Sequence, residues 1–596
     1  MDQISTYLRD KYGYETGPYQ GYSSNSFSTK FLVRLDWNIN KNHRFNIRYN
    51  ELKSESSRVP ASTSTSPFTN VYPQNRQSTQ ALQYENTGYF QAANFTSLAA
   101  ELNSTFSKKF YNTLRATYTR QNDPRTTKGS QFPFVDILKD GTPLTSFGTE
   151  LFSYGNLRDV EMYSFVDNLT WSAGKHNFLV GAQADFNTTK NGFQRFGTGF
   201  YVFQSWDDFI SGKLPSHYGL TYSLSPNFAQ AFPTFKFAQY SAYAQDEINV
   251  NNKLKITAGI RFDLPTYPEP LKEHPLISKL TFAKGEKINT ATLPKSTVMV
   301  SPRVGFNYDV KGDRSLQVRG GTGIFTGRVP FVWIVSQAGD AGMLQVTQTW
   351  TGKDVPGPFR LEPYYPATVP VAGTSIPTGG TTAISPEFKN PQTWKSNLGV
   401  DIQLPLGFVA TFEGIYNKDL NTAYFRNANL VDPTPFNVSG YPDNRLMYPS
   451  SNTQKYINPL TSAGQYSPTG TTAYNATILG NASQGYYFSF NAKIEKQFSK
   501  GFFASLAYVR NGAKNLFDGS GDQPASAFQG TATVNGSNFP VLSYANYVVP
   551  NRIIGSLSYR KEYAKFMATS VSFVYQGSAD GRFSYTYSTD FQPRRC

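Results

Sequence analysis

The sequence predicts an all-β fold, an antiparallel β-barrel whose strands cross a membrane. Three observations lead to this prediction. Eight pairs of segments that alternate between apolar and polar residues each meet across a short turn. Long polar stretches separate one pair from the next, so tight and long connections alternate along the chain. Aromatic residues make up 15% of the chain while the mean hydropathy is −0.44, which suits strands with one face toward lipid and one toward water.

The eight short turns locate the hairpins. They lie at Ile39–Asn42, Ser107–Lys109, Ala173–Lys175, Asn251–Lys253, Lys311–Asp313, Pro405–Gly407, Ser499–Gly501 and Tyr563–Lys565. Each hairpin contributes two strands, and Arg582–Ser588 continues the alternating pattern after the last pair. The sequence therefore predicts about 17 strands of about 10 to 14 residues, long enough to cross a bilayer at a tilt.

The alternation is clearest in the segment Lys253–Pro265. Ile256 and Ile260 lie on one face and Arg261 and Asp263 on the other, because strand side chains alternate with period two. An unpaired ion buried in a dry core costs several kcal/mol, so the charged face must be wet or paired. We therefore expect the apolar set to face lipid and the charged set to face an aqueous lumen.

The same division between two faces recurs in the other hairpins, for example in Phe178–Phe186 and in Leu398–Leu404. We expect six charged side chains to face the lumen, where they would contact a plug or a solute: Arg261, Asp263, Arg303, Arg319, Asp401 and Glu413. The segment Gly320–Phe325 is rich in glycine but continues a strand pattern. It therefore favours close approach of another element over a phosphate-binding loop.

Seven long stretches separate the hairpins and are rich in Pro, Gly, Ser, Thr, Asn and Tyr. They are Glu55–Ala93, Asn122–Asp159, Thr189–Phe235, Thr266–Ser296, Arg328–Gln392, Asn421–Gln484 and Gly512–Asn551. Membrane barrels of this type have short periplasmic turns and long extracellular loops. Their Tyr and Asn side chains could stack on a solute and form hydrogen bonds with it. A surface that captures a ligand and a passive shield over the pore both remain open.

Composition argues against several functional classes. The net charge is +15, but the basic residues are dispersed without an RNA-binding signature or a basic helix, so we expect no nucleic acid. Cys596 is the only cysteine, and the four histidines have no metal-ligand spacing. We find no catalytic constellation, and we expect neither an enzyme activity nor a cofactor or a metal site. Lys and Arg side chains that line a lumen and face lipopolysaccharide explain the net charge of +15 better than a nucleic-acid partner does.

The hydropathy of the chain limits how it can cross a membrane. The chain has no run of about 18 apolar residues, so no helix is expected to span a membrane. A membrane protein with this sequence must then be a closed barrel, because open backbone edges cannot lie in hydrocarbon.

The N-terminal sequence MDQISTYLRDKYGYE lacks the features of a signal peptide. We expect that the start has been trimmed or that the chain is a fragment.

Two central motifs carry a family resemblance: YAQDEINVNNKLKITAGIRFDLP at Tyr243–Pro265 and SPRVGFNYDVKGDRSLQVRGGTGIFTGRVPFVW at Ser301–Trp333. The first resembles the mid-barrel signature of TonB-dependent outer-membrane receptors. The second is similar to the next hairpin in the Oar-like branch of that family, which is common in Bacteroidota. The likeness continues in Asp167–Phe186 and in Pro550–Ser588 and covers most of the chain.

The resemblance implies a 22-stranded barrel in the outer membrane of a Gram-negative bacterium, with an N-terminal plug. It also implies import driven by the TonB–ExbB–ExbD complex through a short TonB box. No plug or TonB box precedes the first hairpin, Lys30–Lys53, and the chain stops at YSTDFQPRRC, where relatives would continue into their closing strands. We therefore expect residues 1–596 to form a partial receptor barrel in outer-membrane lipid and lipopolysaccharide, with a surface lipoprotein as a further partner.

Three functions compete on this sequence. The leading hypothesis is the barrel of a TonB-dependent transporter or receptor that captures a solute with its outer loops. The alternative is a plugless porin or a surface adhesin of the outer membrane. A soluble β-propeller or glycan-binding sandwich fits less well, because propeller blades repeat four strands in about 40 to 50 residues. Loop composition does not choose among siderophore, glycan and peptide as the solute.

Overall fold

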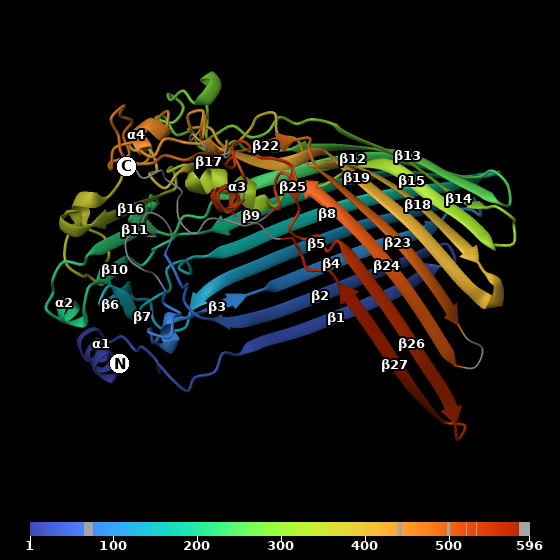
Figure 1. Cartoon of the computed structure of the whole chain (residues 1–596), viewed down its shortest axis with the longest axis horizontal. Helices are drawn as coiled ribbons and strands as arrows, with labels where there is room; N and C mark the ends of the chain where they lie inside the picture. Colours follow the sequence, from blue (N-terminus) through green and yellow to red (C-terminus); the bar gives the residue numbers. More distant parts are fainter. Residues whose placement is uncertain are drawn as a thin grey trace.

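The computed structural model describes residues 1–64, 75–437, 439, 444–497, 501–519, 521, 523–531 and 533–582. Sixteen long strands form one curved antiparallel sheet, which we call the wall (Figure 1). The wall strands are β1 (Ser26–Asn40), β2 (His43–Arg58), β4 (Asn94–Thr105), β5 (Phe110–Thr127), β8 (Leu157–Ala173), β9 (His176–Gly192), β12 (Thr234–Asn249), β13 (Leu254–Thr266), β14 (Met299–Asp309), β15 (Leu316–Thr326), β18 (Gln392–Gln403), β19 (Phe408–Asn427), β23 (Tyr486–Gln497), β24 (Phe502–Asn515), β26 (Asn551–Tyr563) and β27 (Met567–Ser578).

Each wall strand pairs with the next wall strand along the chain, and every one of these pairings is antiparallel. The predicted hairpins and the antiparallel fold are thereby confirmed. The predicted turn Ser499–Gly501 and the predicted seventeenth strand, Arg582–Ser588, lie largely outside the described residues.

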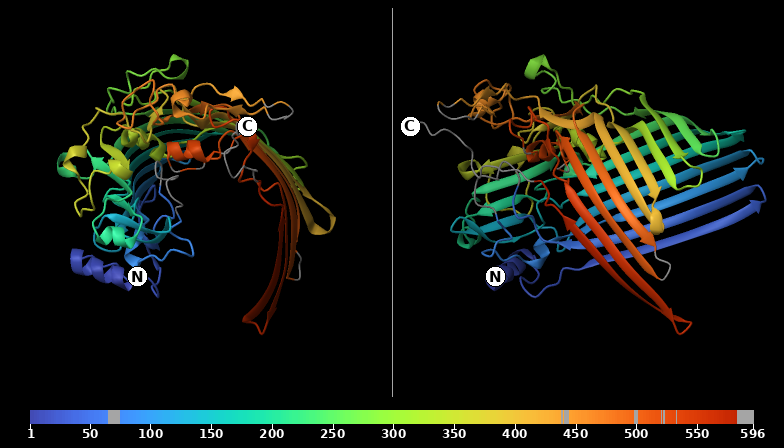
Figure 2. Two further views of the ribbon diagram at one scale, coloured as in Figure 1. Left: turned by 60° about the vertical axis from the view of Figure 1, so that its left-hand side comes forward. Right: turned by 45° about the vertical axis from the view of Figure 1, so that its right-hand side comes forward.

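The wall has two free edges within the described part of the chain. There, β1 pairs only with β2, and β27 pairs only with β26. Figure 2 shows the wall as an arc whose two edges stand apart. The described strands therefore leave the sheet open, although its curvature is that of a barrel wall.

Nine of the sixteen wall strands have the predicted 10 to 14 residues, whereas the other seven are longer and the prediction is wrong for those. β5 has 18 residues and β19 has 20. The end of β19 explains the difference, because Thr422–Asn427 pairs with β22 (Ala476–Ala482) and not with β23. β19 therefore runs past the end of the wall and into the structure that the long connections form.

The long connections, together with the N-terminal segment, build a folded body at one end of the wall, which we call the lobe (Figure 1). Besides β22, its elements are α1 (Asp2–Tyr12), β3 (Tyr89–Ala92), β6 (Phe134–Lys139), β7 (Thr142–Phe147), β10 (Phe200–Phe203), α2 (Trp206–Ile210), β11 (His217–Ser223), α3 (Phe331–Asp340), β16 (Gln345–Thr351), β17 (Thr381–Ile384), β20 (Thr434–Pro435), β21 (Leu446–Met447), α4 (Asn452–Lys455), α5 (Pro524–Gly530) and β25 (Ser543–Tyr544). Five of these strands form a second sheet in the order β16-β11-β10-β6-β7.

The lobe has hydrophobic cores of its own. One core joins Ile4 and Leu8 of α1 to Val135 of β6, Tyr218 of β11 and Tyr365, all of them buried. Segments from four separate parts of the sequence thus pack together. The long polar stretches are a folded body here, and their composition alone did not indicate this.

Helix α3 covers part of the inner face of the wall, close to the lobe. Its residue Phe331 packs against Phe235 and Phe237 of β12, with ring centroids 5.6 and 5.4 Å apart. Those two side chains are buried, whereas Thr234 before them and Lys236 between them are exposed on the opposite face. The connection after β15 therefore folds inward. Among the described residues, no helix is both long and apolar enough to cross a membrane.

Candidate functional site: a polar cavity on the inner wall

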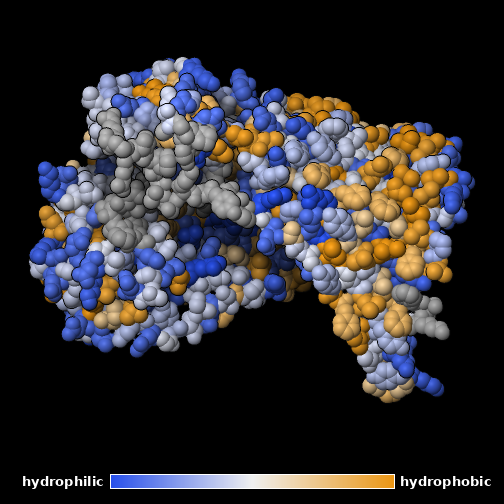
Figure 3. Space-filling model, in the orientation of Figure 1, coloured by the Kyte–Doolittle hydropathy of each residue, from blue (hydrophilic) through white to orange (hydrophobic). Residues whose placement is uncertain are grey.

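The two faces of the wall differ in chemistry as the alternation predicted. On β13, Ile260 and Phe262 point outward and are 38% and 42% exposed. Asp263, the next residue along the strand, points to the inner face and is 3% exposed. Apolar side chains from many wall strands gather on the outer surface, which is orange over the wall in Figure 3. Polar and charged side chains gather on the concave face, and there they form the candidate site.

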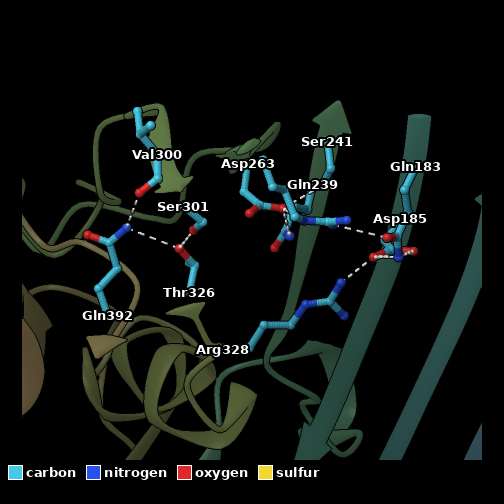
Figure 4. Close-up of polar contacts among 11 residues, drawn as sticks. Gln183, Asp185, Gln239, Ser241, Asp263, Val300, Ser301, Thr326, Arg328 and Gln392 are labelled. Carbon is cyan, nitrogen blue, oxygen red and sulfur yellow. Dashed lines mark hydrogen bonds and ion pairs between the residues drawn. The ribbon is translucent and has the colours of Figure 1, made fainter. Parts of the chain in front are cut away.

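Asp263 is the centre of a hydrogen-bond network that links two neighbouring strands (Figure 4). Its Oδ1 accepts hydrogen bonds from Arg261 Nε at 2.8 Å, Ser241 Oγ at 2.7 Å and Gln239 Nε2 at 3.1 Å. Arg261 also donates through Nη2 to Gln183 Oε1 on β9 at 3.0 Å. A buried carboxylate with a guanidinium and two neutral donors is well satisfied, so this network is rigid.

A second carboxylate attaches the inward-folded connection to the wall. Asp185 on β9 is 2% exposed and forms an ion pair with Arg328, which follows β15 (Figure 4). Gln183 donates through Nε2 to both carboxylate oxygens of Asp185, at 3.1 and 3.0 Å. The Asp263 and Asp185 networks therefore meet at Gln183.

A cavity of about 380 Å³ lies beside these networks, and we call it the inner cavity. Its lining is Gln183, Gln239, Arg261, Asp263, Ser301, Arg303, Phe325, Thr326, Gly327 and Arg328. Polar side chains from five wall strands surround it. At its edge Ser301 and Thr326 share a hydrogen bond of 3.0 Å, and Gln392 donates to Thr326 Oγ1 at 3.1 Å (Figure 4).

Arg303 is positioned by a glycine and by an aromatic ring. Gly323 lies directly across from it on β15, and a Cβ atom on that glycine would be 2.7 Å from Cβ of Arg303. The guanidinium carbon of Arg303 is 5.0 Å from the ring centroid of Phe325. The glycine-rich segment Gly320–Phe325 thus lies within a strand and allows a close approach, as the sequence indicated.

The other predicted residues form a separate cluster nearer the short turns. Arg319 on β15 forms an ion pair with Asp401 on β18, and its Nη2 lies 3.9 Å from Oε1 of Glu413 on β19. Thr411 donates to Asp401 Oδ1 at 2.7 Å. Gly399 lies opposite Arg319, where a Cβ would be 3.0 Å from the guanidinium carbon.

The structure thus divides the six predicted residues into two groups. Arg261, Asp263 and Arg303 line the inner cavity, while the other three form the cluster around Arg319. Whether any of the six contacts a plug or a solute stays a prediction. The sequence reasoning missed Lys395 and Arg328. Lys395 could have been found, because it is two residues before Asn397 and so shares its face of β18.

A larger cavity of about 580 Å³, the mouth cavity, lies between the wall and the lobe. Its aromatic lining includes Trp333 of α3, Tyr487 of β23, Phe517 and Tyr547. Lys395, Asp419, Lys514 and Asp518 supply charged groups to the same lining. Arg328 lines both this cavity and the inner cavity, so the two are neighbours.

The family described as outer membrane beta barrel domain matches residues 10–560, which is most of the chain. The chain belongs to this family. The membrane that its apolar outer face meets is therefore the outer membrane, as the resemblance implied. No curated protein matches the sequence.

A solved structure of an outer-membrane transporter shares the fold of this chain. The outer membrane transporter YddB from Escherichia coli is 9% identical with a TM-score of 0.50, and the match covers 90% of this chain and 61% of that one. The FrpB iron transporter from Neisseria meningitidis is 9% identical with a TM-score of 0.47, and the match covers 93% and 61%. The chain thus spans less than two thirds of the length of both transporters.

Proposed function

We propose that this chain is the barrel portion of a TonB-dependent receptor or transporter of the Oar-like branch. Its lobe captures a solute outside the cell, and the complete protein imports that solute with energy transmitted by TonB–ExbB–ExbD. The family match and the fold support the outer-membrane barrel on which this proposal is built. The central motifs Tyr243–Pro265 and Ser301–Trp333 support the branch by their resemblance.

One observation carries the solute-binding part of the proposal. The mouth cavity and the inner cavity lie next to each other where the lobe meets the concave wall. Together they combine aromatic rings, paired charges and free polar groups, which is the chemistry of a site for a small molecule. A passive shield over a pore would not require a preformed cavity of this volume.

Uptake by living cells tests the proposal. Cells that carry the complete protein would be given radiolabelled iron chelates, oligosaccharides and peptides, in paired strains with and without TonB. We expect at least one solute to accumulate only when both the protein and TonB are present. Equal accumulation without TonB would exclude energised import.

The free edges of β1 and β27 support a proposal about the complete barrel. A strand edge exposed in hydrocarbon leaves peptide groups without hydrogen-bond partners, at several kcal/mol for each group. We therefore infer that residues 1–596 are part of a larger barrel of the 22-stranded type, in which further strands pair with β1 and β27. A photoreactive residue introduced in the complete protein at position 30, or at position 569, would crosslink to an added strand, and not to the opposite edge of the wall.

One structural feature favours the alternative of a plugless porin. The connection after β15 folds inward through Arg328 and α3, so this chain narrows its own lumen. Single-channel recording of the complete protein in planar bilayers separates the two functions. A plugged receptor stays nearly closed, whereas a porin gives steady open-channel currents.

We also propose partners that follow from the location of the protein in the outer membrane. The apolar outer face meets membrane lipid and lipopolysaccharide, and the outer end of the lobe is available to a surface lipoprotein. Purification of the protein from outer membranes in mild detergent would show whether such a lipoprotein remains attached.

A further inference from the structure

Several charges on the inner wall are paired, whereas Asp419, Lys514 and Asp518 of the mouth cavity form no ion pair within the described residues. Arg261 pairs with Asp263, Arg328 pairs with Asp185, and Arg319 pairs with Asp401 and lies near Glu413. Arg303 and Lys395 differ, because neither forms an ion pair or a side-chain hydrogen bond within the described part of the chain. Two cations on the same patch of wall thus lack a counter-ion.

Both of these cations lie against one aromatic ring. The Arg303 guanidinium carbon is 5.0 Å and the Lys395 Nζ is 5.5 Å from the ring centroid of Phe325. Cation–π contacts hold the two groups in place without using their N–H donors. Two like charges near one ring also repel each other, and an anion that contacts both would relieve that repulsion.

Phe325 connects the two cations to the inner cavity. The ring and Arg303 line the inner cavity, whereas Lys395 lines the mouth cavity beside it. Phe325 is 37% exposed even though it points to the polar face of the wall. The cations are therefore accessible from the concave side of the wall.

The same cavity contains an unsatisfied hydrogen-bond acceptor. Gln239 is 6% exposed and donates through Nε2 to Asp263, but its Oε1 has no partner among the described residues. An unpaired buried acceptor costs about 1 to 3 kcal/mol, so a bound donor would be favourable there. A hydroxyl group of a ligand can supply that donor, while an acidic group cannot.

We infer that the inner cavity binds a hydroxylated solute through its acidic group, with Arg303 and Lys395 contacting the acid and Gln239 accepting from a hydroxyl. A sugar acid has this combination of groups. The cavity volume of about 380 Å³ falls in the range of small-molecule sites. The inference deepens the proposed transport function and rests on it, because it assigns a solute class to the same lumen.

Calorimetric titration of the complete protein in detergent tests the inference, with D-glucuronate as the probe and D-glucose as the uncharged control. We expect glucuronate to bind and glucose to bind at least about tenfold more weakly, since a hydrogen bond to a charged group is worth about that factor. Arg303→Met and Lys395→Met should each weaken glucuronate binding by about tenfold.

A matched variant controls for the loss of charge. Arg44→Met removes the same charge from β2, where Arg44 Nε donates to Asn38 Oδ1 at 3.0 Å. It should leave glucuronate affinity unchanged. Equal weakening by Arg44→Met would mean that the general field of the wall, and not this site, attracts the anion, and it would overturn the inference.

The hydroxyl contact has its own test. Gln239→Leu should weaken glucuronate binding but not the binding of cyclohexanecarboxylate, which has the acid without hydroxyl groups. Loss of both would contradict the assigned role of Gln239. A wild-type protein that binds neither glucuronate nor cyclohexanecarboxylate would overturn the whole inference, and its TonB-dependent uptake of another solute would still stand as a separate result.

Discussion

The wall and the lobe are built on opposite principles. Every pairing in the wall joins strands that follow one another along the chain, and its side chains alternate between two environments. The lobe joins distant segments, and β10 pairs in parallel with β6 while β17 pairs in parallel with β22. The wall therefore depends on a repeated local pattern, whereas the lobe depends on particular contacts. Substitutions in the two regions should differ accordingly.

The largest expected effect is in the lobe, at a buried ion pair. Arg76 donates to both carboxylate oxygens of Asp136 at 2.8 and 2.6 Å, and both side chains are fully buried. Arg76→Met leaves a buried carboxylate without its cation and should lower lobe stability by about 3 to 5 kcal/mol. Hydrogen exchange of amides in β6 and β10 would measure the loss.

Two comparisons sharpen that result. Arg9→Met removes one partner of an exposed ion pair with Asp10, and it should change stability by less than about 1 kcal/mol. Amides of β13 in the wall should exchange at unchanged rates in the Arg76 variant. If wall and lobe loosened together, the two regions would form one cooperative unit and the contrast between them would fail.

The next effect concerns the two faces of one wall strand. Ile260→Arg places a charge on the outer face of β13 and should cost about 2 to 4 kcal/mol near the middle of a bilayer. Thr257→Arg places the same side chain on the inner face, opposite Glu247 of β12, and should be close to neutral. Urea unfolding in lipid vesicles would compare the two variants. Equal costs would mean that the faces are assigned wrongly.

A smaller effect is expected where glycine makes room for an inward arginine. A Cβ at position 323 would lie 2.7 Å from Cβ of Arg303, so Gly323→Ala should cost about 1 to 3 kcal/mol. Gly414→Ala is the matched control, because nothing lies within 4 Å of a Cβ there. Alanine at 414 should be neutral or slightly stabilising in the same unfolding measurement.

The smallest effect is a dependence of lobe stability on pH. Burial lowers the pKa of His274, whose Nδ1 accepts a hydrogen bond from Ile277 N while Nε2 contacts the carbonyl oxygen of Ser375 at 3.0 Å. The unfolded chain therefore binds a proton that the folded lobe excludes, and stability falls as pH drops below about 6.5. The loss is at most about 1.4 kcal/mol for each pH unit.

Hydrogen exchange in the connection around His274 at pH 7.5 and 5.5 would measure this loss. His274→Gln keeps a donor for the Ser375 carbonyl and an acceptor for Ile277 but cannot titrate. Its exchange should therefore no longer respond to pH in this range. A response that persists in this variant would assign the effect to another group.

The sequence was sufficient for the wall but not for the lobe. Period-two alternation and short turns placed the hairpins and their two faces, since both are local properties of a strand. The lengths of seven strands were underestimated, and in β2, β5 and β19 the additional residues pair with lobe elements. The parallel pair of Phe200–Phe203 with Phe134–Ile137 joins residues 66 apart, and no local pattern announces such a contact.

Only part of the candidate site could be predicted from the sequence. Arg261, Asp263 and Arg303 could be placed on the inner face by alternation, because each lies within a regular strand. Arg328 could not, since it lies in a connection whose inward course depends on the packing of α3. Gln239 becomes notable only in three dimensions, where its Oε1 is buried without a partner in the described structure.

The core that joins α1 to Tyr365 has a consequence for the order of folding. That core draws on residues more than 350 positions apart, and it cannot assemble before the chain is present as far as Tyr365. Wall hairpins can form one after another from local contacts, whereas such non-local contacts form slowly. Newly made molecules should therefore pass through an intermediate with formed wall hairpins and a protease-sensitive lobe.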